Sequence, residues 1–192
     1  MAQQFNTNGL FQKNSAVRRI GILMIVIMSF VLPGACSVKI DDYRDTRPVL
    51  DLQTYLRGEL TAWGIFQSRN GEVKRYFKVN ISADWSGDIC TLRERFMFND
   101  GEEQQRTWII TRHDAHHYTG TAGDVVGEAR GVAQGNTLNW RYLLKVPVNG
   151  SVYKLRFDDW MYLVDDDILI NRAEVTKFGF RVADVTIFFQ KQ

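Results

Sequence analysis

Two carboxyl groups stand among apolar side chains and are the first residues in the sequence that could do chemistry. Glu94 lies in the alternating run 90–98, and Asp159 lies in the alternating run 138–163. A carboxyl group on the apolar face of a strand has a raised pKa, as the general acid of a glycosidase does. A buried charge is otherwise tolerated mainly when it is paired and hydrogen-bonded. Ion pairing is therefore the favoured interpretation, ahead of ligand-headgroup binding and well ahead of catalysis.

The turns between the strands assign a cation to each of these acids. A three-residue turn rich in Asn, Asp and Gly places Glu94 opposite Arg106 in the next strand. A turn made of two aspartates places Asp159 opposite Arg172. We therefore expect two cross-strand ion pairs on the apolar face, and both arginines are candidates for binding a ligand headgroup.

A group of histidines is the candidate for metal binding. His113, Asp114, His116 and His117 carry groups that bind zinc or copper. Their spacing matches no established ligand pattern, and histidines in a polar hairpin turn are commonly solvated. We therefore predict no metal site and no cofactor.

The sequence also argues against an enzyme with a nucleophilic side chain. No G-x-S-x-G motif is present, and Cys90 lies on an apolar strand face, where a thiol is ordinarily inert. Catalysis is thus the least favoured of the function classes.

A run of small residues could leave room for a ligand. The alternate positions of this run are Gly127, Ala129, Gly131, Ala133 and Gly135. The next strand places Trp140 opposite Gly131 and brings Tyr142 to the same face. Two interpretations follow. The bare face borders a cavity for an acyl chain, with Arg106 or Arg172 at its polar end, or Trp140 covers Gly131 and fills the space.

The elements that position these residues are predicted to be strands. Asn149 and Gly150 separate two alternating runs, which is a strong hairpin signal, and the register sets Trp140 beside Asp159. Short turns recur along the chain, and Asp51 is a plausible N-cap for one short helix. We predict an all-β fold, an antiparallel up-and-down barrel of eight to nine strands, because closure removes the sheet edges.

Residues 1–35 have the order of a secretory signal peptide. Basic residues precede an uninterrupted apolar run over 20–32, and small residues with Cys36 follow it. A small residue before this cysteine resembles the bacterial lipobox, in which the cysteine is acylated and becomes the mature N-terminus. We expect a signal peptide at 1–35, a lipidated tether at 36–47 and a barrel domain at 48–192. An uncleaved anchor and a cleaved, unlipidated signal are the alternatives.

The expected location is the bacterial outer membrane, with the domain held by its lipid on the periplasmic face. Ser37 is not the acidic residue associated with retention in the inner membrane. An acyl tether also favours a barrel with an apolar interior over a barrel that spans the membrane, because an integral barrel needs no tether.

The charge of the mature chain gives no reason to expect nucleic acid as a partner. Removal of residues 1–35 leaves 21 Lys and Arg against 22 Asp and Glu. The mature domain is therefore near neutral, and it has no basic run with interleaved aromatic residues.

Several spaced motifs lie in the second half of the chain. They are Thr119, Gly120, Thr121, Ala122, Asp124, Val125, Val126, Gly127, Glu128, Ala129, Gly131, Trp140, Arg141, Tyr142, Asp158, Asp159, Trp160, Met161, Asn171, Arg172, Lys177, Phe178 and Gly179. At these residues the chain resembles a bacterial lipoprotein family, the domain-of-unknown-function family 3833, over roughly residues 48–190. The resemblance implies a lipocalin-like barrel and an envelope location, and it assigns no catalytic residue.

Two functions of different classes therefore remain. One is a binding module that holds a lipid or another small apolar ligand inside the barrel. The other is a structural or assembly lipoprotein that has a filled barrel and acts through an envelope protein partner. A cavity beside the small-residue run would favour the first, and a packed interior would favour the second.

Overall fold

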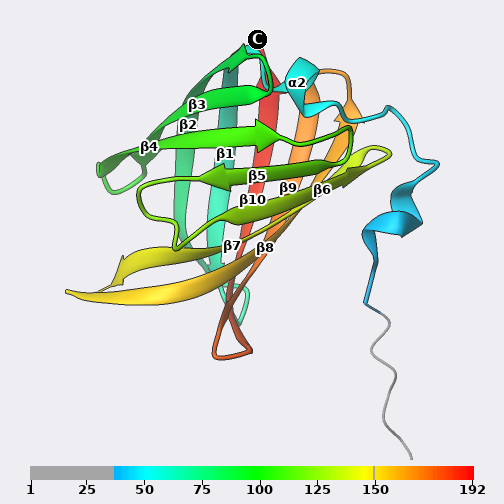
Figure 1. Cartoon of the computed structure of the whole chain (residues 1–192). Helices are drawn as coiled ribbons and strands as arrows, with labels where there is room; N and C mark the ends of the chain where they lie inside the picture. Colours follow the sequence, from blue (N-terminus) through cyan, green and yellow to red (C-terminus); the bar gives the residue numbers. More distant parts are fainter. Residues whose placement is uncertain (1–36, 149) are drawn as a thin grey trace, which may run out of the picture. The chain divides into compact units, whose positions relative to one another are not determined.

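A barrel of β-strands follows two short helices in the computed structural model, which describes residues 37–192 with the exception of residue 149 (Figure 1). The helices are the 3-10 helix η1 (Ile40–Tyr43) and the α-helix α2 (Leu52–Tyr55). The described strands are β1 (Gly58–Ser68), β2 (Val73–Ser86), β3 (Ile89–Phe98), β4 (Glu103–Arg112), β5 (His117–Thr121), β6 (Ala129–Gln134), β7 (Thr137–Val148), β8 (Ser151–Asp165), β9 (Ile168–Lys177) and β10 (Phe180–Lys191). Within the described ranges, no helix has the length and apolar character needed to cross a membrane.

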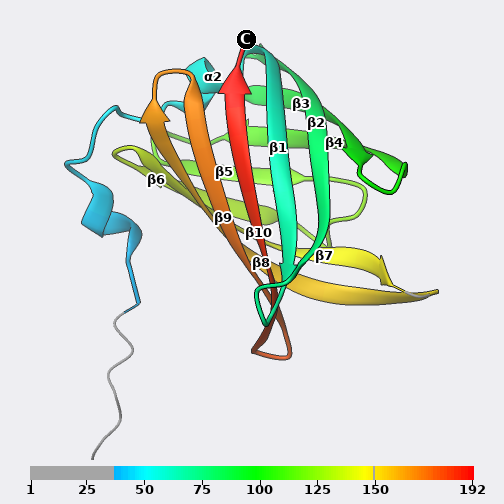
Figure 2. The ribbon, with the colours of Figure 1, turned by 180° about the vertical axis from the view of Figure 1, so that it is seen from behind.

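The strands close into a single barrel. Each strand pairs in antiparallel orientation with the next, and β1 pairs with β10 (Figures 1 and 2). The predicted all-β, up-and-down, lipocalin-like barrel is confirmed. The described strands number ten rather than eight to nine. The shortest of them are β5 and β6, with five and six residues.

Most of the strand registers follow the turn sequences. In the β7–β8 hairpin Trp140 lies opposite Asp159, and in the β3–β4 hairpin Glu94 lies opposite Arg106, as predicted. Gly150 has a positive φ of 79°, as the hairpin turn requires, whereas Asn149 lies outside the described residues. The turns therefore determine which side chains face the interior.

The predicted register of β8 with β9 is wrong. The ladder is irregular between Leu163 and Asp165, and this extra residue shifts all the following pairs by one. Arg172 consequently lies opposite Trp160, and Asp159 lies opposite Ala173. A one-residue shift moves a side chain to the other face of a strand, so Arg172 is exposed on the outside of the barrel.

The apolar face of the strands forms the interior. The core contains buried side chains from all ten described strands, and the exposed charged residues lie on the opposite face. These exposed residues include Lys74, Lys78, Arg141, Lys145, Lys154 and Arg156. The barrel therefore has the apolar interior that the sequence favoured.

Helix α2 covers one end of the barrel. Asp51 caps it by accepting a hydrogen bond from the Gln53 backbone N at 3.2 Å, as the sequence predicted. Leu52 and Tyr55 are 2% and 4% exposed, and Tyr55 Oη lies 3.4 Å from the Asp167 carbonyl oxygen in the β8–β9 turn. Because alternate turns of a meander lie at the same end, the β1–β2, β3–β4, β7–β8 and β9–β10 turns lie at the other end.

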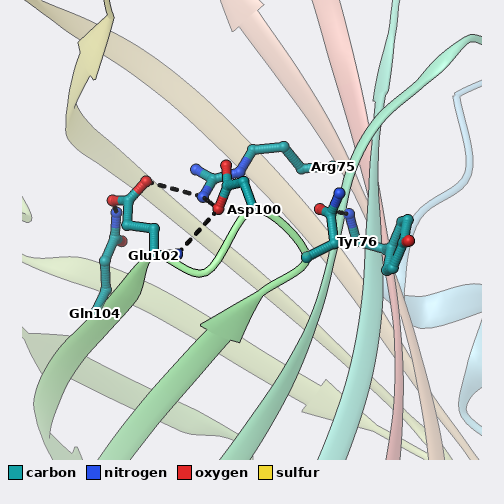
Figure 3. A network of polar contacts seen from close by, with 6 residues as sticks. Arg75, Tyr76, Asp100, Glu102 and Gln104 are labelled. Atoms are coloured by element: carbon teal, nitrogen blue, oxygen red, sulfur yellow. Dashed lines mark hydrogen bonds and ion pairs between the residues drawn. The ribbon is translucent and has the colours of Figure 1, made fainter.

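At that other end a half-buried arginine joins β2 to the β3–β4 turn (Figure 3). One Arg75 guanidinium nitrogen lies 2.8 Å from Asp100 Oδ1 and 2.8 Å from Glu102 Oε2. The guanidinium also lies 3.8 Å above the centre of the Phe98 ring. We call Arg75, Asp100 and Glu102 the rim network.

Candidate functional site

The barrel encloses a cavity of about 230 Å³. Its wall is mainly apolar and aromatic, with side chains from β2, β3, β4, β7, β8, β9 and β10, and α2 closes it at one end. Phe77, Trp108, Tyr142 and Phe157 supply much of the aromatic surface. A concave, mainly apolar space with a few converging polar groups is the usual form of a small-molecule site.

Five polar side chains line this cavity, and we call them the polar cluster. They are Glu94, Arg106, Tyr142, Asp159 and Asn171, one each from β3, β4, β7, β8 and β9. All five occupy positions that alternate with outward side chains, so the strand period brings them to one space. The cluster unites both inward acids identified in the sequence.

The Arg106 guanidinium is directed mainly toward a loop. Its Nη2 lies 2.9 Å from Asp124 Oδ2, in the β5–β6 loop, and its Nε donates a hydrogen bond to the same oxygen at 3.0 Å. The predicted partner Glu94 is farther away, with Oε2 at 3.7 Å from Nη1. Arg106 thus forms a close, two-nitrogen ion pair with Asp124 and a longer one with Glu94.

Acceptor oxygens of the polar cluster lack hydrogen-bond donors. Tyr142 Oη donates to Asp159 Oδ2 at 3.2 Å, but Asp159 Oδ1 has no partner among the described residues. Glu94 Oε2 and Asn171 Oδ1 are likewise buried without a hydrogen-bond donor in the described part of the chain. Buried polar atoms are normally hydrogen-bonded, so three such acceptors around one cavity require an explanation.

Burial raises the pKa of both acids to near neutral pH. It raises the pKa of Glu94 to about 7, and Asp124 raises it further while Arg106 opposes the shift. Burial likewise raises the pKa of Asp159 to about 7, with hydrogen bonding by Tyr142 acting in the opposite direction. The pKa of Tyr142 is raised well above its ordinary value by burial and then by Asp159. Both carboxyl groups can therefore exchange a proton near physiological pH.

The small-residue run does not border the cavity. Gly127 is exposed in the β5–β6 loop with a positive φ of 71°, while Ala129 and Gly131 are buried in β6. The Trp140 ring occupies the space where a Cβ of Gly131 would lie, and its Cζ2 would be 2.7 Å from a Cβ at Gly120. The interpretation that Trp140 fills this space is correct, and the cavity lies on the polar-cluster side of the interior.

Sequence reasoning missed two residues of the site. It placed Arg172 inside, whereas Asn171 is the inward residue and is 2% exposed. The alternation itself carried the signal, because Leu169, Ala173 and Val175 share the face of Asn171. The second is Asp124, which lies in the β5–β6 loop, where no turn signal links it to Arg106.

The other candidate residues lie outside the cavity. His117 Nδ1 contacts Asp114 at 2.9 Å, and within the described residues no group of three or more histidine, cysteine or acidic side chains is placed to hold a metal ion. Burial raises the pKa of the Cys90 thiol to about 11, which fits an inert core thiol. Cys36 lies outside the described residues.

Two solved structures share the fold. A DUF3598-family protein of unknown function from Nostoc punctiforme PCC 73102 is 14% identical with a TM-score of 0.55, over 76% of this chain and 51% of that one. This chain thus spans about half the length of that protein. The S-type phycobiliprotein lyase CPES from Guillardia theta is 5% identical with a TM-score of 0.53, over 81% of this chain and 99% of that one.

The sequence comparisons agree with the motifs of the second half of the chain. No curated protein matches the sequence. A family model described as "Protein of unknown function (DUF3833)" matches residues 29–191, which include the whole barrel and the polar cluster. The chain therefore belongs to the DUF3833 family.

Proposed function

We propose that this protein binds a small, largely apolar molecule inside its barrel. The observation that carries the proposal is the cavity of about 230 Å³ beside a buried polar cluster. A barrel that served only as a scaffold would be filled by its own side chains, because protein interiors pack nearly as densely as organic crystals. Here a cavity remains although large aromatic side chains, including Trp140, line it.

The size of the cavity limits the ligand. A volume of 230 Å³ holds roughly eight groups the size of a water molecule. It therefore fits a molecule of about eight non-hydrogen atoms, or the end of a longer chain. Leu52, Tyr55 and Leu56 of the α2 segment line one end, so the ligand would lie against this cover.

The proposal includes an envelope location. The charged, apolar and small-residue order of residues 1–35 supports a signal peptide, with Cys36 acylated and the domain on the periplasmic face of the outer membrane. The intact mass of the protein from membranes should correspond to a chain that begins at acylated Cys36. Cys36→Ser should release the domain, and a chain that retains Met1 would contradict this assignment.

A cavity-filling variant tests ligand binding. Val185 in β10 lines the cavity, and Val185→Trp should fill it and abolish binding of octan-1-ol, measured by calorimetry on the full chain. The matched control is Val182→Trp in the same strand, since Val182 is 37% exposed and does not line the cavity. Equal binding by wild type and Val185→Trp would overturn the proposal.

A partner-binding role is the second candidate, favoured by the tip of the β9–β10 hairpin. This hairpin extends beyond the body of the barrel (Figures 1 and 2). Phe178 and Phe180 are 89% and 74% exposed there. A photo-crosslinking residue in place of Phe178 should then give one defined protein adduct in intact cells, and Val185→Trp should leave that adduct unchanged.

A further inference from the structure

Three acceptor oxygens of the polar cluster have no hydrogen-bond donor within the described residues. Asp159 is 4% exposed and Asn171 is 2% exposed, and each has one side-chain oxygen without a donor in the described part of the chain. Glu94 Oε2 is a third such oxygen, at the long ion-pair distance from Arg106. All three residues line the cavity, and their unpartnered oxygens are buried in its wall, so a ligand contacts them only when neighbouring side chains move.

We infer that the ligand carries a cationic, hydrogen-bond-donating head group of the alkylamine type, held between Glu94, Asp159 and Asn171. This inference rests on the proposed function, because it names the chemistry of the molecule that fills the cavity. A primary ammonium group has three N–H donors and no acceptor. Three unpartnered acceptor oxygens are the complement of that group.

The charges around the cavity favour a cation over a carboxylate. Glu94 and Asp159 face the space with one guanidinium, Arg106, whose closest contacts are with Asp124 outside the cavity wall. A ligand carboxylate would meet two acidic side chains and a cation that already has a partner. It would also bring further acceptors to a site in which three acceptor oxygens already lack a donor within the described residues. The fatty acid considered from the sequence is therefore a poor fit, because the second expected cation, Arg172, lies outside.

Aromatic rings add a second reason for a positive charge. Tyr142 stacks on Phe157 with ring centres 5.1 Å apart, and Trp108 meets Tyr142 edge-on at 5.4 Å. All three line the cavity next to the polar cluster. Cations are attracted to aromatic faces, and more strongly where water is excluded.

The protonation of the two acids makes binding depend on pH. The pKa of Glu94 and of Asp159 is about 7, and a bound cation would favour their ionised forms. The charged or titratable groups that act on them are Arg106 on β4, Asp124 in the β5–β6 loop, Tyr142 on β7 and Asp158 on β8. Amine binding should therefore strengthen as the pH rises through about 7 and should release protons.

Three eight-carbon probes that differ only in the head group test the inference on the full chain. Octylamine, octan-1-ol and octanoate are titrated by calorimetry at about pH 8 and about pH 5. Octylamine should bind about tenfold more tightly than octan-1-ol at the higher pH, with octanoate the weakest, and this preference should decline at the lower pH. Changing the ionisation enthalpy of the buffer should reveal the released protons.

Variants identify the side chains responsible. Asp159→Asn should weaken octylamine binding about tenfold while octan-1-ol binding stays nearly constant, which also shows that the cavity is intact. Asn171→Ala provides the same test from β9 if the first variant does not fold. Glu174→Gln is the matched control, because Glu174 is exposed on the outer face of β9.

The outcomes separate the two proposals. If octan-1-ol or octanoate binds in the cavity as tightly as octylamine, the cationic head group is wrong and the cavity proposal stands. If none of the three probes binds, the cavity proposal fails and the inference fails with it. If Asp159→Asn and Asn171→Ala both leave the preference for octylamine unchanged, the assigned residues are wrong.

Discussion

The barrel contains two arginines that each lie between two carboxylates, and their surroundings differ. In the rim network Arg75 lies 2.8 Å from both Asp100 and Glu102, whose side chains are about half exposed (Figure 3). In the interior Arg106 lies 2.9 Å from Asp124 but 3.7 Å from Glu94, whose side chain is 13% exposed. At the rim one guanidinium nitrogen thus contacts both carboxylates at 2.8 Å, whereas in the interior the contact with the second carboxylate is longer.

The pKa values of the acids in the rim network and in the interior are shifted in opposite directions. A backbone hydrogen bond from Glu102 and the contact with Arg75 lower the pKa of Asp100, and hydrogen bonds from Gln104 and Arg75 lower the pKa of Glu102. Burial raises the pKa of Glu94 although Arg106 is near. The residue types alone therefore do not distinguish a structural ion pair from a binding site. The two are distinguished by the burial of the charged groups and by the number of hydrogen-bond donors available to them.

Removing each arginine should give the largest contrast. Arg106→Met leaves Glu94 and Asp124 without their cation inside the protein, and we expect a loss of about 3 to 5 kcal/mol in the free energy of unfolding at about pH 8. Arg75→Met should cost only a small part of that, because water solvates the exposed carboxylates. Urea unfolding of both variants measures the difference. Equal losses would show that the interior charges are as well solvated as the rim charges.

The dependence of the free energy of unfolding on pH should reflect the opposite pKa shifts of the interior and rim acids. Glu94 and Asp159 have a pKa of about 7 in the folded protein and of about 4 when unfolded. The folded state therefore binds more protons between these values, so their stabilising contribution is complete below about pH 4 and is lost as the pH rises to about 7. We expect an effect on the order of 4 kcal/mol for each acid.

The matched measurement is the difference between wild type and a variant with both Glu94→Gln and Asp159→Asn. This difference removes the contributions of the surface acids, including Asp100 and Glu102, whose lowered pKa values stabilise the protein above their unfolded pKa and lose that effect as the pH falls. A difference that is constant between about pH 4 and about pH 8 would mean that neither interior acid titrates near neutrality.

Packing should distinguish the filled and open sides of the interior. Gly131→Leu forces a side chain into the Trp140 ring, and we expect a loss of about 1 to 3 kcal/mol with octan-1-ol binding retained. The control is Gly123→Ala, because a Cβ at Gly123 meets nothing within 4 Å and its φ is not positive. Thermal unfolding compares the two variants. Loss of binding in Gly131→Leu without loss of stability would place the cavity beside β6 instead.

Salt should have the smallest effect and should act only on the rim. Raising the ionic strength from about 0.1 M to about 1 M shortens the screening length from about 10 Å to about 3 Å. The effect of Arg75→Met on unfolding should therefore vanish at high salt, while the effect of Arg106→Met persists. Parallel losses of both effects would indicate that bulk solvent reaches the polar cluster.

The sequence predicted the fold and part of the site because turns determine strand registers. The pair of Glu94 with Arg106 follows from one regular turn, and the pair of Trp140 with Gly131 follows from another. The pair of Asp159 with Arg172 failed because one irregular residue near the β8–β9 turn reversed the faces of β9. Such a residue does not disturb the alternation of apolar and polar side chains along β9. It can be recognised only by asking which of the two alternating sets of β9 side chains is the apolar set that faces the interior.

Contacts made by loops and the position of empty space were not predictable in the same way. Asp124 contacts Arg106 from a loop, and a loop has no repeating side-chain pattern from which its path could be predicted. The small-residue run was interpreted as room either for a ligand or for Trp140, and the Trp140 ring occupies it. A cavity is the space that remains after all side chains have packed, so no single stretch of sequence encodes its position.

The pairing of β1 with β10 determines when the barrel can form. Leu60 lies opposite Lys191, so the sheet cannot close until β10 is available to pair with β1. Contacts of such long sequence separation form late, and a growing chain that lacks β10 retains two unpaired edges. The barrel therefore cannot close before β10 has been synthesised, and until then β1 and β9 remain the open edges of the sheet.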